Sequence, residues 1–167
     1  MYPFTHAAYP FVVALVALAP MIECTPKPQD AKAKAVAEDL KRLAGTWELV
    51  FSGWKGKEFP LPPVWTGTDK PQITILPDGS LQTEGAEEGS SKSWYRIDPT
   101  ARPKTIDFVR RLKDGREQVL KIGIYEIDGD ELHKCDTPSR RPRPTDFTFN
   151  RDSYQVYHLY RRVKEKK

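Results

Sequence analysis

Residues 117–136, EQVLKIGIYEIDGDELHKCD, constrain the fold of this chain more than any other stretch. Leu120, Ile122 and Ile124 recur at every second position, which is the period of a β-strand. Asp128-Gly129-Asp130 follows them, and Asp-Gly strongly favours a hairpin turn because glycine adopts a positive φ at no steric cost. The stretch therefore predicts a β-hairpin that turns at Gly129.

The second half of this hairpin keeps the same alternation. Leu132 and Lys134 fall on one face, and His133 and Cys135 fall on the other. Similar segments on both sides predict an antiparallel β domain of about eight strands, either a sandwich or an up-and-down barrel. The other expected strands are residues 46–51, 72–76, 80–84, 93–98, 103–112, 146–149 and 154–163.

One short helix is expected ahead of the strands. Within residues 31–44, Val36, Leu40 and Leu43 form one apolar stripe at helical spacing. Gly45 follows, where a helix commonly ends in a left-handed residue.

The N-terminus has the composition of a targeting segment. Residues 11–19 are apolar, about as long as a signal-peptide core and too short to span a bilayer. We therefore expect an exported protein of the periplasm or cell envelope, with a signal-like or anchoring segment at 1–24. Membrane contact is expected only through this segment, if it stays uncleaved or if Cys24 is lipidated. Residues 25–34 are expected to be a linker, 35–164 one barrel domain and 165–167 a tail.

Composition agrees with a soluble globular domain. The chain has 167 residues, 38% hydrophobic and 30% charged, with a net charge of +4. The 2 cysteines, Cys24 and Cys135, are too few for a disulfide framework.

Residues 52–70 combine chain-breaking glycines and prolines with large apolar side chains. A long aromatic loop of this kind is either a plug folded onto the core or a lid over a ligand site. Under the lid interpretation, the expected ligand-binding residues are Trp54, Phe59 and Trp65, joined by Trp94 if its ring faces inward.

Leu43-Ala44-Gly45-Thr46-Trp47, a helix running into Gly-x-Trp, resembles the start of a lipocalin-type barrel. That resemblance implies that Trp47 closes one end of the barrel beneath an arginine of the last strand, Arg161 or Arg162, with Arg162 slightly favoured. The chain is also similar to a domain family of unknown function from planctomycete bacteria. The shared motifs are the GTWELV opening, Pro-Lys-x-Ile-Asp at 103–107, GIYEIDGDELHKC and the Arg-Pro…Phe segment at 143–147. The resemblance covers residues 40–163 and implies export, but no activity.

The residues give little support for catalysis. His133 and His158 stand at no metal-ligand spacing, and neither an orienting group nor an oxyanion site is recognisable beside His133 and Cys135. We therefore expect no catalytic residue, no metal and no cofactor.

Nucleic acid is not an expected partner either. Basic groups at 110–116 and 140–143, with nearby tyrosines, have the composition of a phosphate-binding surface, but an export signal argues against that partner. The sequence predicts a non-enzymatic, monomeric, lipocalin-like barrel that binds a small apolar or amphipathic ligand. The alternative is an interaction or envelope-structural domain with a side-chain-filled barrel and another envelope protein as partner.

Overall fold

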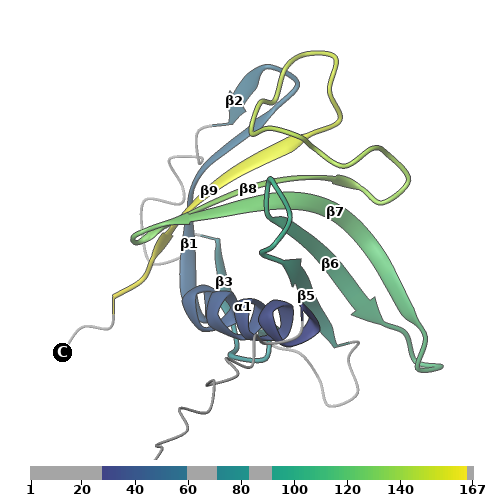
Figure 1. Ribbon diagram of the computed structural model, residues 1–167. Helices are drawn as coiled ribbons and strands as arrows, with labels where there is room; N and C mark the ends of the chain where they lie inside the picture. Colours follow the sequence, from purple (N-terminus) through teal and green to yellow (C-terminus); the bar gives the residue numbers. More distant parts are fainter. Residues whose placement is uncertain (1–27, 60–70, 83–91, 165–167) are drawn as a thin grey trace, which may run out of the picture.

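The computed structural model describes residues 28–59, 71–82 and 92–164 (Figure 1). These residues form one helix and a sheet of 9 strands. In chain order the elements are α1 (Pro28–Leu43), β1 (Gly45–Trp54), β2 (Lys57–Phe59), β3 (Gln72–Ile75), β4 (Leu81–Gln82), β5 (Ser93–Asp98), β6 (Thr105–Arg111), β7 (Glu117–Asp128), β8 (Glu131–Pro138) and β9 (Val156–Arg162).

The strands form a nearly closed antiparallel barrel. Their order is β4-β3-β1-β9-β8-β7-β6-β5, with β2 paired to β1, so from β5 to β9 each strand pairs with the next one along the chain. The last strand returns to pair with the first. At the remaining seam, the Tyr95 amide donates to the Gly79 carbonyl at 2.9 Å, and Ser80 forms a bridge with Trp94. This architecture confirms the expected lipocalin-like up-and-down barrel preceded by a short helix.

The central hairpin has the predicted turn. Asp128 pairs with Glu131, which leaves Gly129 and Asp130 as a two-residue loop, and Gly129 has a φ of 55°. From Lys121 to Asp128 the register is unbroken, so the alternation in the sequence is also the alternation of side chains between the two faces.

Helix α1 begins earlier than expected. It starts at Pro28, so residues 28–34 are helical and do not form the predicted linker. Proline is tolerated in a first helical turn because its missing N–H has no partner there, and Asp30 in the same turn complements the helix dipole. The strands arch over α1 (Figure 1), and Leu43 is completely buried in the core.

Two strand predictions needed correction. β1 continues to Trp54 through a bulge at Val50 and turns back at Lys55 and Gly56, which both have positive φ. This is the mark of a type I′ turn, whose twist suits a hairpin. Residues 146–149 form no strand and belong to the long connection at 139–155.

The connection at 139–155 packs against the outer face of the barrel. The Phe149 ring stacks on Tyr157 of β9, with ring centroids 5.9 Å apart. Arg143 Nη1 donates to Asp107 Oδ1 at 2.6 Å and to the Gly123 carbonyl at 2.7 Å. Gly53 allows the close approach, because a Cβ there would lie 2.7 Å from the Phe149 ring. Both faces of β8 are therefore covered.

Candidate functional site: a charged cluster inside the barrel

Strand β8 directs two charged side chains into the barrel. Leu132 belongs to the hydrophobic core, so Lys134 and Asp136, two and four residues further on, face the same side. Lys134 pairs with His158 of β9, and residues directly opposite in an antiparallel pair share a face. On β7, Lys121 lies opposite Phe108, whose ring packs against the core. Lys121, Lys134, Asp136 and His158 therefore face the interior, and we call them the charged cluster.

The charged groups are in direct contact. Lys134 Nζ lies 3.0 Å from Asp136 Oδ2 and donates a hydrogen bond to the Tyr95 hydroxyl at 3.3 Å. Lys121 Nζ lies 3.1 Å from Asp136 Oδ1. Only 8% of the Lys134 side chain and 5% of the Asp136 side chain are exposed, against 44% for Lys121. The cluster thus extends from solvent at Lys121 to the deep interior at Lys134.

Burial and charge act in opposite directions on this pair. Burial on its own raises the pKa of Asp136, but the positive charges of Lys134 and Lys121 outweigh it and hold the pKa below its usual value. Burial on its own lowers the pKa of Lys134, but Tyr95 and Asp136 outweigh it and raise that pKa well above its usual value. Lys134 and Asp136 therefore face each other as ammonium and carboxylate at neutral pH.

His158 adds a polar group without a charge. Burial, reinforced by repulsion from Lys134, lowers the pKa of His158 to about 4. Its Nδ1 lies 3.2 Å from the Ser52 hydroxyl of β1. A neutral imidazole retains one donor and one acceptor nitrogen, so it can contact either kind of polar group.

Hydrogen bonding within the cluster is incomplete among the described residues. They offer two acceptors, Asp136 Oδ2 and the Tyr95 hydroxyl, to the three N–H groups of the Lys134 ammonium. Asp136 Oδ1 accepts no hydrogen bond from them, because the nearby Lys121 ammonium lacks the required geometry. Lys134 Nζ also lies over the Tyr95 and Tyr160 rings, 5.3 Å and 5.9 Å from their centroids. Buried polar groups are normally satisfied, so Asp136 Oδ1 has capacity for a hydrogen-bond donor.

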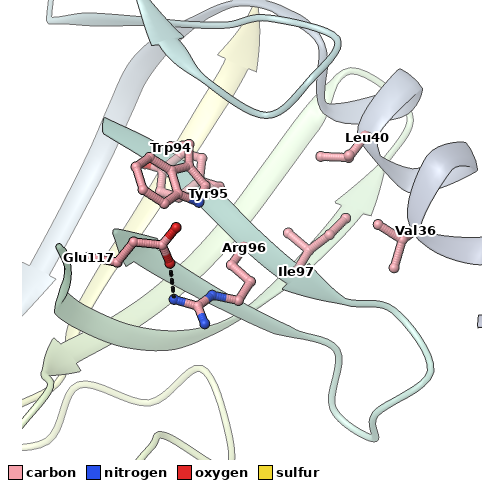
Figure 2. Close-up of a pocket in the computed structure, with 7 residues that line it drawn as sticks. All are labelled: Val36, Leu40, Trp94, Tyr95, Arg96, Ile97 and Glu117. Carbon is pink, nitrogen blue, oxygen red and sulfur yellow. Dashed lines mark ion pairs between the residues drawn. The ribbon is translucent and has the colours of Figure 1, made fainter. Parts of the chain in front are cut away.

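A groove lies along the edge of β5, and none of the four residues of the charged cluster lines it. Figure 2 shows Trp94 beside the Arg96–Glu117 ion pair, whose closest atoms are 3.7 Å apart, and Ile97 near Val36 and Leu40 of α1. The groove has a volume of about 330 Å³. Tyr95 lines it and also accepts the hydrogen bond from Lys134, so this residue joins the groove to the cluster.

Of the predicted ligand residues, the structure describes the side chains of Trp54 and Trp94, which lie on different strands. Trp54 ends β1 with 40% of its surface exposed and Lys55 Nζ 4.7 Å from its ring centroid. Trp94 lies on β5, which is not a neighbour of β1, and lines the groove. The backbone of Phe59 ends β2, whereas its side chain and all of Trp65 lie outside the described residues. Their role in binding stays a prediction.

The Gly-x-Trp motif at the start of β1 forms the closed end of the barrel. Trp47 is fully buried, and its Nε1 donates to the Leu43 carbonyl at 2.7 Å. Arg162 packs over the indole, with its Cζ 4.0 Å from the ring centroid, whereas Arg161 pairs with Glu131 on the surface. Gly45 has a φ of 125°, and a Cβ there would lie 2.8 Å from Arg162.

The outward face of β8 lacks an activated nucleophile. Burial, with Asp136 and Asp146, raises the pKa of the Cys135 thiol to about 12, so the thiol stays protonated at neutral pH. Its Sγ donates to the Thr148 carbonyl at 3.8 Å, while His133 Nδ1 lies 2.8 Å from the Tyr157 hydroxyl.

The charged cluster was not among the sites predicted from the sequence. Its signal was the alternation of β8, which already placed Lys134 on the face of Leu132. Whether that shared face is the barrel interior depends on how the barrel closes. Asp136 follows the same alternation, whereas Lys121 and His158 join the cluster only through strand pairing.

Comparison of the chain with protein-family models, curated proteins and solved structures finds no match. Within residues 28–59, 71–82 and 92–164, no group of three or more His, Cys, Asp or Glu side chains is arranged to hold a metal ion. In the same part of the chain, no helix is long and apolar enough to cross a membrane.

Proposed function

We propose that this protein is an extracytoplasmic, non-enzymatic, lipocalin-like barrel that binds a small amphipathic ligand inside the barrel. The charged cluster is the observation that carries the proposal. A buried ion pair is a poor way to stabilise a fold, because apolar side chains of similar volume usually do as well or better. This barrel nevertheless keeps Lys134 and Asp136 almost completely buried, and Asp136 Oδ1 accepts no hydrogen bond from the described residues.

The two ends of the barrel suit an amphipathic molecule. At the α1 end, the core is dense and apolar around Trp47, Leu132 and Ile106. The charged cluster lies further along the strands, with Lys121 reaching solvent. Tyr95 and Phe108 border both regions, with ring centroids 6.1 Å apart. A ligand with one polar end and one apolar end would match this arrangement.

The proposal also includes an extracytoplasmic location and excludes nucleic acid as a partner. The apolar run at 11–19 supports an extracytoplasmic location. The basic groups suggestive of nucleic acid are partly neutralised, because Arg111 pairs with Glu117 and Arg143 pairs with Asp107.

The test is binding of amphipathic small molecules to the purified chain. Native mass spectrometry should show a one-to-one complex with a medium-chain amphiphile, and tryptophan fluorescence should change saturably during titration. If Trp54 and Trp65 belong to a lid, the variant Trp54→Phe/Trp65→Phe should lose most of that change. A saturable change that survives in the variant would remove the lid from the proposal.

The packed α1 end also favours the structural alternative, a barrel filled by side chains that contacts another envelope protein. No more than 2% of the surface of any of four large residues there is exposed, namely Trp47, Ile106, Leu132 and Tyr125. Absence of binding to every amphiphile in the panel would favour this alternative.

A further inference from the structure

We infer that one end of the barrel docks on an anionic phospholipid membrane through exposed cations and aromatic rings. This inference goes beyond the proposed function and does not depend on a ligand inside the barrel. We call the docking surface the basic tip. Its residues are Trp54, Lys55, Arg140, Arg141, Arg151 and Tyr154.

The basic tip forms where two segments far apart in the sequence meet. β1 and β9 are antiparallel neighbours, so the turn after β1 and the connection before β9 lie at the same end of the sheet. The Gly56 amide donates to the Phe149 carbonyl, and a Cβ on Gly56 would lie 3.4 Å from the Arg151 backbone nitrogen. Figure 1 shows β2 beside the connection at 139–155, on the side of the barrel away from α1. The tip is therefore one continuous surface.

The charge of the tip is mainly positive. Its four cations are exposed, and none of them forms an ion pair within residues 28–59, 71–82 and 92–164. The same two segments carry fewer unbalanced carboxylates. Glu58 is next to a further lysine, Lys57, which leaves Asp146 and Asp152. Each Lys or Arg close to an anionic leaflet strengthens binding by about fivefold, so this excess favours an anionic surface.

The aromatic side chains favour a membrane among the anionic partners. Trp54 is 40% exposed and Tyr154 is 50% exposed. Tryptophan and tyrosine accumulate at the level of lipid headgroups, because each combines an apolar ring with one polar atom. Lys55 Nζ lies 4.7 Å from the Trp54 ring centroid, and Arg141 Cζ lies 3.9 Å from that of Tyr154. These cations occupy ring faces on which the bases of a nucleic acid would have to stack.

The experiment measures cosedimentation of the purified 167-residue chain with lipid vesicles. One vesicle preparation is pure phosphatidylcholine, and the other is an equal mixture of phosphatidylcholine and phosphatidylglycerol. We expect the chain to bind the mixed vesicles at least about tenfold more tightly, with a preference that falls as salt is added. Residues 1–24 contain no lysine or arginine, so insertion of this apolar segment would not produce the preference.

Two matched variants assign the preference to the basic tip. Arg140→Gln/Arg151→Gln should lose most of the preference for the mixed vesicles. Lys34→Gln/Lys41→Gln removes the same charge from exposed positions on α1 and should keep that preference.

A third variant tests the aromatic contact. Trp54→Ser/Tyr154→Ser keeps every charge, and it should bind the mixed vesicles at least about fivefold more weakly because no ring enters the headgroup layer. The parent should also show a blue shift of tryptophan emission on the mixed vesicles, which this variant should lose.

Three results would overturn the inference. The first is equal binding of the parent to both vesicle preparations. The second is a preference that survives in Arg140→Gln/Arg151→Gln. The third is unchanged vesicle binding by Trp54→Ser/Tyr154→Ser together with tighter binding of the parent to alginate, a soluble polyanion, which would identify an acidic polymer as the partner. The proposed function would stand in all three cases, because binding of an amphiphile inside the barrel is measured separately.

Discussion

Arg162 joins three parts of the molecule through one guanidinium group. It covers the Trp47 ring, and its Nη1 donates to the Ala44 carbonyl at 2.7 Å, beside a further bond to the Arg42 carbonyl. These carbonyls lie at the end of α1, where backbone acceptors lack helical partners. A cation there also complements the helix dipole. The last strand thereby fixes the helix and the first strand together.

Trp47→Ala should lower the free energy of unfolding by about 3–5 kcal/mol, because it empties a fully buried aromatic site. Chemical denaturation measures the loss. Arg161→Ala is the control on the same strand, and it should cost less than about 1 kcal/mol because its ion pair with Glu131 is exposed. A loss below about 1 kcal/mol for Trp47→Ala would contradict the closing role of this residue.

Gly129→Val should destabilise the domain by about 1–2 kcal/mol, because Val strongly disfavours a φ of 55°. A Cβ at this position meets nothing within 4 Å, so the effect isolates backbone conformation from packing. Gly129→Asn is the matched control, since Asn tolerates this region better. Equal stability of the two variants by thermal unfolding would show that the turn does not need a positive φ.

At the scale of elements, the sequence predicted strands well where one face alternates strictly. The β7–β8 hairpin is the clearest case, since Lys121 to Asp128 alternates without interruption and the turn glycine is unmistakable. The strand prediction failed at the end of β1, where the bulge at Val50 breaks the period of two. Lys55 then adopts a positive φ, which is not expected for a lysine. The start of α1 at Pro28 was also missed, because proline and lysine are as common in flexible linkers as in a first helical turn.

The candidate site was harder to predict for a different reason. Whether a face of β8 is interior or exterior depends on closure of the barrel and on the cover supplied by residues 139–155, both of which are long-range features. Cys135 is as buried as Leu132 although the two side chains point to opposite faces. Alternation alone therefore could not show that Lys134 faces the barrel interior.

The closing helix depends on a buried carboxylate. Asp39 Oδ2 accepts hydrogen bonds from Lys104 Nζ at 2.6 Å and from the Tyr125 hydroxyl at 2.8 Å, which join α1 to β7 and to the β5–β6 connection. Asp39→Asn should cost about 1–3 kcal/mol, because it weakens two hydrogen bonds to a charged acceptor. Glu38→Gln, an exposed neighbour on α1, should change stability by less than about 0.5 kcal/mol. Similar small losses in both variants by urea unfolding would contradict this role.

At the scale of the whole molecule, the barrel has one closed apolar end and a charged interior further along its strands. Stability and binding are therefore expected to depend on different residues. Trp47, Arg162 and Asp39 hold the closed end, and Lys134 and Asp136 lie in the proposed site. His158 belongs to the site, but its burial also makes the stability of the complete fold sensitive to pH.

The folded protein holds the pKa of His158 at about 4, below its ordinary value of 6.5. Between these two values the unfolded chain binds a proton at this residue and the folded chain does not, so acid favours unfolding. The contribution of His158 is complete above pH 6.5 and is lost as the pH falls toward 4, with a slope approaching about 1.4 kcal/mol per pH unit. Asp39 and Asp136 have pKa values below 3.8, so their protonation acts at lower pH.

The expected measurement is urea unfolding of the parent and His158→Gln at several pH values from 4 to 7. The parent should lose stability through this window more steeply than the variant, so the difference in unfolding free energy should shrink or reverse as the pH falls. Subtracting the variant removes the contributions of other titrating groups, because both proteins share them. A difference that stays constant from pH 7 to pH 4 would mean that the imidazole titrates normally and is not held neutral beside Lys134.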